Sequence, residues 1–219
     1  MPKGRRDLFP SSRAKSRDLA HHALEREDLL MPNTPDTVRE RIARTNRQLL
    51  TLVSDLSESD FARSFGPRAP AIRFHAWHVS RWSDNVQSWL PRLTPELRRR
   101  LGDRPELWDR DGLAKAWGLS ARELGGDRTG MGLADAAAAA LPLPSKDVML
   151  AYASQTFAAL EDALKSIDSP QFEAPCKDWA GRDTTVGGAV IHHLIHINRH
   201  LGMVEALRGI LGARGTATA

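Results

Sequence analysis

Four of the eight histidines of this 219-residue chain lie within nine residues near its C-terminal end, from His192 to His200. Three of them, His192, His196 and His200, are spaced four residues apart. On an α-helix, side chains four positions apart lie on the same face and within reach of one another. A His-x-x-x-His pair of this kind can bind one metal ion through two neutral imidazoles.

A third ligand has to come from another part of the chain. His78 is our candidate, because it shares a helical stripe with Phe74 and Trp82 and so points where apolar side chains point. Three protein ligands leave open positions on the ion for water or a substrate. The sequence therefore predicts a metal site made by His78, His196 and His200.

The neighbouring histidines leave alternatives open. A lone histidine on an apolar face is more often a hydrogen-bonded core residue than a ligand, and the density of histidines here is what favours metal. His192 has the same spacing from His196 as His200 has, so spacing alone also allows the pair His192 and His196. His193 lies about 100° further round the helix and is predicted to support the site or to face solvent. His75 falls on a different face of its helix from the favoured ligand and is set aside.

Four segments with the period of an amphipathic helix must position these histidines. Thr34 and Pro35 begin the first segment as an N-cap and a proline at the first helical position, and Pro91 ends the second. No segment shows the two-residue alternation of a strand. The pattern predicts an all-α four-helix bundle, with long helices at residues 35–57, 71–90, 145–169, and from 184 or 185 to about 211.

Residues 91–144 form a long connection between the second and third predicted helices. Prolines and glycines alternate there with short helical pieces, which is typical of a connection that covers or flanks a pocket. Its glycine pairs, Gly125-Gly126 and Gly130-x-Gly132, are interpreted as turn glycines, because no strand precedes them and no Gly-Lys-Ser/Thr follows. We therefore predict a helical insertion beside the candidate site, whose folding determines the substrate.

Residues 1–33 are predicted to be a basic extension, disordered or loosely docked, ahead of a single domain at residues 34–219. The first eighteen residues alone account for the formal net charge of +4, so the rest of the chain is formally neutral. Nucleic acid is not expected as a partner, since phosphate recognition needs clustered cations. His21 and His22 lie in this extension and are excluded from the site.

The remaining composition indicates a cytoplasmic protein. The longest apolar stretches are too short to cross a bilayer. The N-terminus lacks the apolar core of a secretion signal, and Met31 is an alternative start of the native chain. Cys176 is the only cysteine, which excludes an intramolecular disulfide and suits a reducing compartment. A small-molecule substrate is expected. Pairing of two copies into a homodimer through an exposed helix face is a further possibility.

Two motifs together resemble the DinB-like superfamily of bacterial metal-binding four-helix bundles: Trp77-His78 in the second predicted helix and His196-x-x-x-His200-Leu201-Gly202 in the fourth. The resemblance covers residues 35–212. It implies an up-down-down-up order of the helices, with the long connection between the second and third. It also implies that the ligands are one histidine of the second helix and the last two of the fourth-helix run, which selects His78, His196 and His200.

The chain departs from the family pattern at two places. Many relatives have His-Arg-Gly-Gln where this chain has His200-Leu201-Gly202-Met203, so any polar role of that glutamine is lost. Relatives whose fourth helix offers a glutamate ligand are thiol-dependent isomerases and transferases that use mycothiol or a similar small thiol. This chain has His196 at that position, which separates it from those relatives at the ligand itself.

The expected function is that of a divalent-metal-dependent enzyme with zinc or nickel as the ion. Neutral ligands leave the ion its full double charge, which acidifies a bound water or thiol. The leading reaction is an S-transfer with a low-molecular-weight thiol as co-substrate; a metal-dependent hydrolase and a non-enzymatic, metal-stapled binding or stress-response module are the alternatives. Asp84, Asn85 and Glu205 are candidates for orienting groups and His192 for proton handling, and none is assigned as catalytic.

Overall fold

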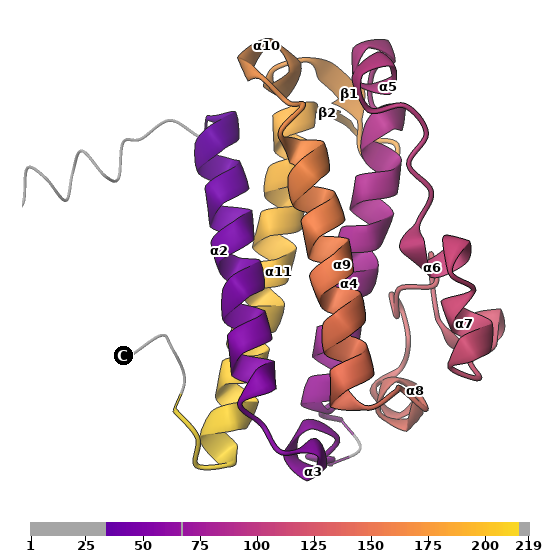
Figure 1. Cartoon of the computed structure of the whole chain (residues 1–219), viewed down its shortest axis with the longest axis vertical. Helices are drawn as coiled ribbons and strands as arrows, with labels where there is room; N and C mark the ends of the chain where they lie inside the picture. The colour runs from indigo at the N-terminus through magenta and orange to yellow at the C-terminus, as the bar shows by residue number, and fades with distance from the viewer. Residues whose placement is uncertain (1–33, 67, 215–219) are drawn as a thin grey trace, which may run out of the picture. The chain divides into compact units, whose positions relative to one another are not determined.

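The computed structural model describes residues 34–66 and 68–214. The predicted extension at 1–33, with His21 and His22, lies outside the described residues. The body of the described chain consists of four long helices, and the all-α prediction is confirmed. Figure 1 shows these helices as α2 (Pro35–Ser54), α4 (Ile72–Trp89), α9 (Lys146–Leu164) and α11 (Val186–Ile210).

The helices α2 and α11 run downward in Figure 1, whereas α4 and α9 run upward. Helix α2 packs against α9 and α11, and α4 packs against the same two helices. Because α4 and α9 are neighbours that point the same way, the chain returns along the bundle between them. This insertion carries the short elements η1 (Leu90–Arg92), α5 (Pro95–Leu101), α6 (Leu107–Arg110), α7 (Leu113–Ala116), η2 (Ala121–Glu123) and α8 (Asp135–Ala140).

Apolar side chains from all four long helices form the core between them. Ile42 of α2, Trp77 of α4, Leu160 of α9 and Val204 of α11 are fully buried there. Each large apolar side chain removed from water contributes roughly 1.5–3 kcal/mol. Within residues 34–66 and 68–214, no helix combines the length and the apolar character that a membrane span requires.

Side-chain caps decide where the first long helix begins and ends. Thr34 accepts a hydrogen bond from a backbone N–H in the first turn of α2, as the sequence predicts. The helix ends at Ser54 rather than at residue 57, because Ser57 caps a separate short helix, α3 (Glu58–Phe61). Because the Ser57 side chain accepts a hydrogen bond from the backbone of the next short helix, the first long helix is shorter than predicted.

The segment between α9 and α11 differs from the prediction. Helix α9 ends at Leu164, and Asp168 caps the short helix α10 (Ser169–Phe172). A hairpin of two antiparallel strands, β1 (Pro175–Lys177) and β2 (Asp183–Thr185), then leads into α11. The prediction that the chain has no strand is wrong here, because strands of three residues are too short for a two-residue alternation to show.

A buried polar cluster on α4 fastens the insertion to the bundle. The Asp84 carboxylate is fully buried and accepts hydrogen bonds from the backbone N–H groups of Leu107, at 2.8 Å, and Trp108, at 2.9 Å. Arg81, also fully buried, donates to Glu106 at 2.7 Å. Buried charges persist in proteins only with such partners. The cluster thus holds the insertion against α4, one turn from the candidate ligand on that helix.

Candidate metal centre

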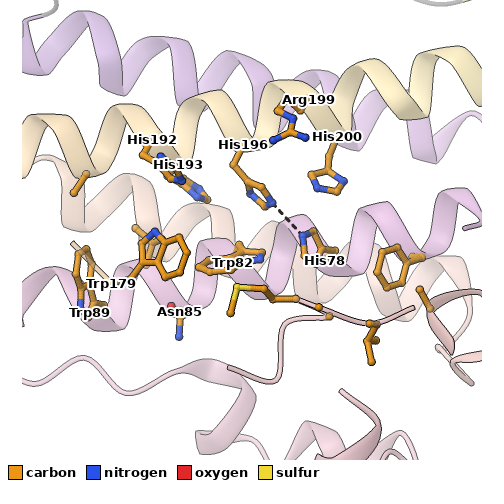
Figure 2. A pocket seen from close by; sticks show the side chains of 18 of the residues that line it. His78, Trp82, Asn85, Trp89, Trp179, His192, His193, His196, Arg199 and His200 are labelled. Carbon is orange, nitrogen blue, oxygen red and sulfur yellow. Dashed lines mark hydrogen bonds between the residues drawn. The ribbon is translucent and has the colours of Figure 1, made fainter. Parts of the chain in front are cut away.

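The structure brings His78 of α4 together with His196 and His200 of α11, as Figure 2 shows. One ring nitrogen of each lies within 4.8 Å of the other two. The ring centroids are 5.0 Å apart for His78 and His196, 4.6 Å for His78 and His200, and 4.7 Å for His196 and His200. His192, the alternative partner for His196, is exposed and lies instead beside Trp179, with ring centroids 6.1 Å apart.

The ring of His78 is oriented by the insertion. Its Nδ1 is within hydrogen-bonding distance of the backbone carbonyl of Thr129. Because a carbonyl only accepts, this nitrogen carries the proton. The Nε2 of His78 is therefore unprotonated, and it faces the Nε2 of His196 at 3.0 Å. An unprotonated ring nitrogen is the form that binds a metal ion.

A second contact orients His200. Its Nδ1 lies 3.0 Å from the Nδ1 of His75, a buried residue one turn before His78 on α4. If Nδ1 of His200 donates this hydrogen bond and Nδ1 of His75 accepts it, Nε2 of His200 is unprotonated and free to bind an ion. Sequence reasoning set His75 aside because of its helix face. The three-residue spacing between His75 and His78 could have indicated that His75 lies next to the site, since side chains three residues apart are neighbours on a helix.

The rings of the cluster are neutral at neutral pH. Burial lowers the pKa of His78 to about 4 and the pKa of His196 to about 3. Burial, reinforced by the neighbouring imidazoles, lowers the pKa of His200 to about 2. Burial also lowers the pKa of His75 to about 4. Since a histidine ligand has to be neutral, the cluster is in the metal-binding form across the physiological range.

The donor set and its spacing fit a divalent ion. Nitrogens bound to tetrahedral zinc at roughly 2.0–2.1 Å lie about 3.4 Å from one another, which is close to the 3.0 Å between the Nε2 atoms of His78 and His196. Three imidazoles without a carboxylate suit zinc, nickel, cobalt or copper, whereas magnesium and calcium prefer oxygen. The residues present therefore fit the kind of ion that the sequence predicts.

A cavity of about 380 Å³ opens beside the three histidines. Its walls include four large aromatic side chains, Phe74, Trp82 and Trp89 from α4 and Trp179 from the turn of the hairpin. Figure 2 shows the three tryptophans along one side of this space and the histidines of α11 along the other. Pockets of about 300–1,000 Å³ with few polar groups are typical of small-molecule sites. The cluster thus borders a space that could admit a small organic ligand.

The sequence profile of the DinB superfamily matches residues 41–204. The chain belongs to the DinB superfamily. The match extends from α2 to α11 and includes all three clustered histidines. The resemblance noted from the histidine motifs is therefore confirmed.

The DinB fold of this chain is also similar to that of a solved structure, a conserved protein from Enterococcus faecalis. The two chains are 14% identical, with a TM-score of 0.62, and the likeness covers 81% of this chain and 96% of that one. At this identity the comparison supports the fold alone. No curated protein matches the sequence.

The residues suggested as orienting groups lie in different surroundings in this DinB-superfamily protein. Asn85 lines the cavity and donates to Glu106 at 3.0 Å. Asp84 is buried in the cluster that holds the insertion, and Glu205 does not line the cavity. His193 is only 4% exposed and lines the cavity, so the solvent-facing alternative is wrong.

The insertion loop at residues 125–132 approaches the histidines closely. Directly after Thr129, Gly130 has a φ of +91°, and a Cβ at this position would lie 2.9 Å from Trp77 and 3.1 Å from Nδ1 of His78. The interpretation of these glycines as turn residues agrees with the positive φ values of Gly125, Gly130 and Gly132. Gly130 has a further role, because only a residue without a side chain lets the Thr129 carbonyl reach the ring of His78.

We expect Gly130→Ala to weaken zinc binding about tenfold or more, since changes in the groups that orient a ligand typically cost 10–100-fold in affinity. The added methyl group would displace His78 or the loop. Gly132→Ala is the matched control: Gly132 also has a positive φ, +75°, but a Cβ added there would have no atom within 4 Å. Competition with a chromophoric chelator measures both affinities, and equal losses would show that backbone strain alone is responsible.

Proposed function

We propose that this protein is a divalent-metal-dependent enzyme in which His78, His196 and His200 hold a zinc or nickel ion. The observation that carries the proposal is the meeting of three neutral ring nitrogens, from two helices, beside a cavity of about 380 Å³. Structural zinc sites are closed by four protein ligands, whereas catalytic sites keep one position open. Three ligands next to a cavity therefore favour catalysis over a purely structural ion.

The chain's own residues prepare the site for this role. The Thr129 carbonyl and His75 hold His78 and His200 in the orientation of ligands, so an ion can bind with little rearrangement. When bound, the ion lowers the pKa of a coordinated water or thiol. His192, exposed and lining the cavity, is the group proposed to accept the released proton.

Transfer of a low-molecular-weight thiol to an electrophilic substrate is the reaction that we favour, and metal-dependent hydrolysis is the second candidate. The aromatic walls, Phe74, Trp82, Trp89 and Trp179, support transfer. Aromatic side chains beside the histidines limit the access of water, which would otherwise compete with the thiol for the electrophile.

Elemental analysis of the purified protein tests the metal, with roughly one zinc or nickel ion per chain as the expected result for a single three-histidine site. Turnover is then assayed with cysteine, coenzyme A and a glycosylated cysteine thiol against an aryl halide, and with an activated ester for hydrolysis. Activity should disappear when the ion is stripped and return when it is restored. A loaded protein that is inert in all assays, and whose melting temperature falls on stripping, would instead be a metal-stapled binding module.

A further inference from the structure

The surroundings of the three histidines are short of negative charge. Three imidazole ligands bring no negative charge, so a bound divalent ion would keep its full charge. Among the described residues that line the cavity, Asp135 is the only carboxylate, and it is exposed at the start of α8. Arg199 of α11 lines the same cavity and adds a further positive charge.

Arg199 has no acidic partner within the part of the chain that the structure describes. Two arginines of the insertion are paired by comparison, Arg104 with Asp162 at 3.2 Å and Arg128 with Asp109. Arg199 is exposed, and it directly precedes the candidate ligand His200 on α11. An unpaired guanidinium that borders a cavity is a ready binding group for a carboxylate or another anion.

The position of Arg199 on α11 places it at the rim of the cavity. His192 and Arg199 are seven residues apart and therefore lie on the same side of the helix. Both are exposed, and both line the cavity. Figure 2 shows Arg199 on α11 between His196 and His200. A ligand whose anionic group binds Arg199 would therefore have that group close to the metal centre.

The aromatic walls of the cavity favour a ligand whose body, apart from its anionic group, is apolar. The rings of Trp82 and Trp179 lie 5.9 Å apart in an edge-to-face arrangement, and both border the cavity with Phe74 and Trp89. Flat apolar groups gain most from such walls, since aromatic rings bury large areas and pair in defined geometries. The volume of about 380 Å³ lies at the small end of the range for small-molecule pockets.

We infer that the cavity binds a small organic anion with a flat, apolar body, and that Arg199 recognises its anionic group beside the three histidines. The part of this inference that uses the charge of the ion rests on the proposed function. The part that uses Arg199 and the aromatic walls is independent of metal. Arg199 is thus a specificity-determining residue that selects charged over neutral ligands of the same shape.

Two ligands of the same shape test the inference: naphthalene-2-carboxylate and its neutral amide, naphthalene-2-carboxamide. Each is titrated by calorimetry into the full-length protein, loaded with zinc and metal-free. We expect the carboxylate to bind at least about tenfold more tightly than the amide, as for one good charge-assisted pair. Arg199→Gln should weaken the carboxylate about tenfold with and without zinc, and leave the amide unchanged.

Arg47→Gln is the matched control, because Arg47 is exposed on α2 and does not line the cavity. Equal affinities for the two ligands, no binding of either, or an Arg199→Gln variant that keeps the preference would each overturn the inference. The two proposals fail separately. A protein that holds no metal but discriminates through Arg199 refutes the proposed function alone, and a metal-loaded protein without discrimination refutes the inference alone.

Discussion

Replacing His200 with alanine is expected to reduce the metal content of the purified protein below about half of the wild-type value, and His196→Ala is expected to do the same. Each change leaves two of the three ring nitrogens that lie within 4.8 Å of one another. Two imidazoles bind a divalent ion much more weakly than three, because each ligand contributes part of the binding free energy. Elemental analysis after dialysis against a weak chelator measures the loss.

His192→Ala is the control for this prediction. His192 has the same four-residue spacing from His196 as His200 has, yet it lies outside the cluster. Its replacement should therefore leave the metal content intact. An equal loss in all three variants would contradict the assignment of His78, His196 and His200 as the ligand set.

Asp84→Ala should destabilise the protein by about 3–5 kcal/mol, the usual effect of removing one partner from a buried charged cluster. Besides the backbone groups of Leu107 and Trp108, the carboxylate accepts hydrogen bonds from Arg81 at 3.1 Å, Tyr152 at 2.9 Å and Gln87 at 3.2 Å. The substitution would leave all of these donors buried without their acceptor. Urea denaturation monitored by circular dichroism measures the change.

Asp109→Ala provides the comparison, because Asp109 is 52% exposed and also pairs with an arginine, Arg128. An exposed pair contributes only about 0–1 kcal/mol, so this variant should unfold nearly as the wild type does. A loss below about 1 kcal/mol for Asp84→Ala would mean that the carboxylate does not anchor the insertion.

The sequence was sufficient for the features that repeat along a helix. The long helices, the place of His78 on the inward stripe of its helix and the shared face of His196 and His200 followed from spacings of three and four residues, which depend only on the geometry of a single helix. The choice between His192 and His200 did not follow from spacing, because the two differ only in how far along α11 they lie relative to α4. That distance is set by the packing of two helices, which spacing does not encode.

The features that were missed depend on contacts between distant parts of the chain. The contact of His75 with His200 joins two helices, and the Thr129 carbonyl reaches His78 from the insertion. Asp84 was a candidate orienting group, yet its partners Leu107 and Trp108 place it in the anchor of the insertion. The sequence alone does not distinguish an aspartate that acts at a functional site from one that has a structural role.

The group that holds the ring of His78 is a main-chain oxygen, and every amino acid carries one. The side chain at position 129, whose hydroxyl donates to the Gly126 carbonyl, can therefore change while the hold on the imidazole persists. The constraint falls instead on the next position, where Gly130 must stay small. The insertion can therefore change the ligand that this bundle admits at positions that line the cavity, such as Met131 and Leu133, while the three histidines keep their arrangement.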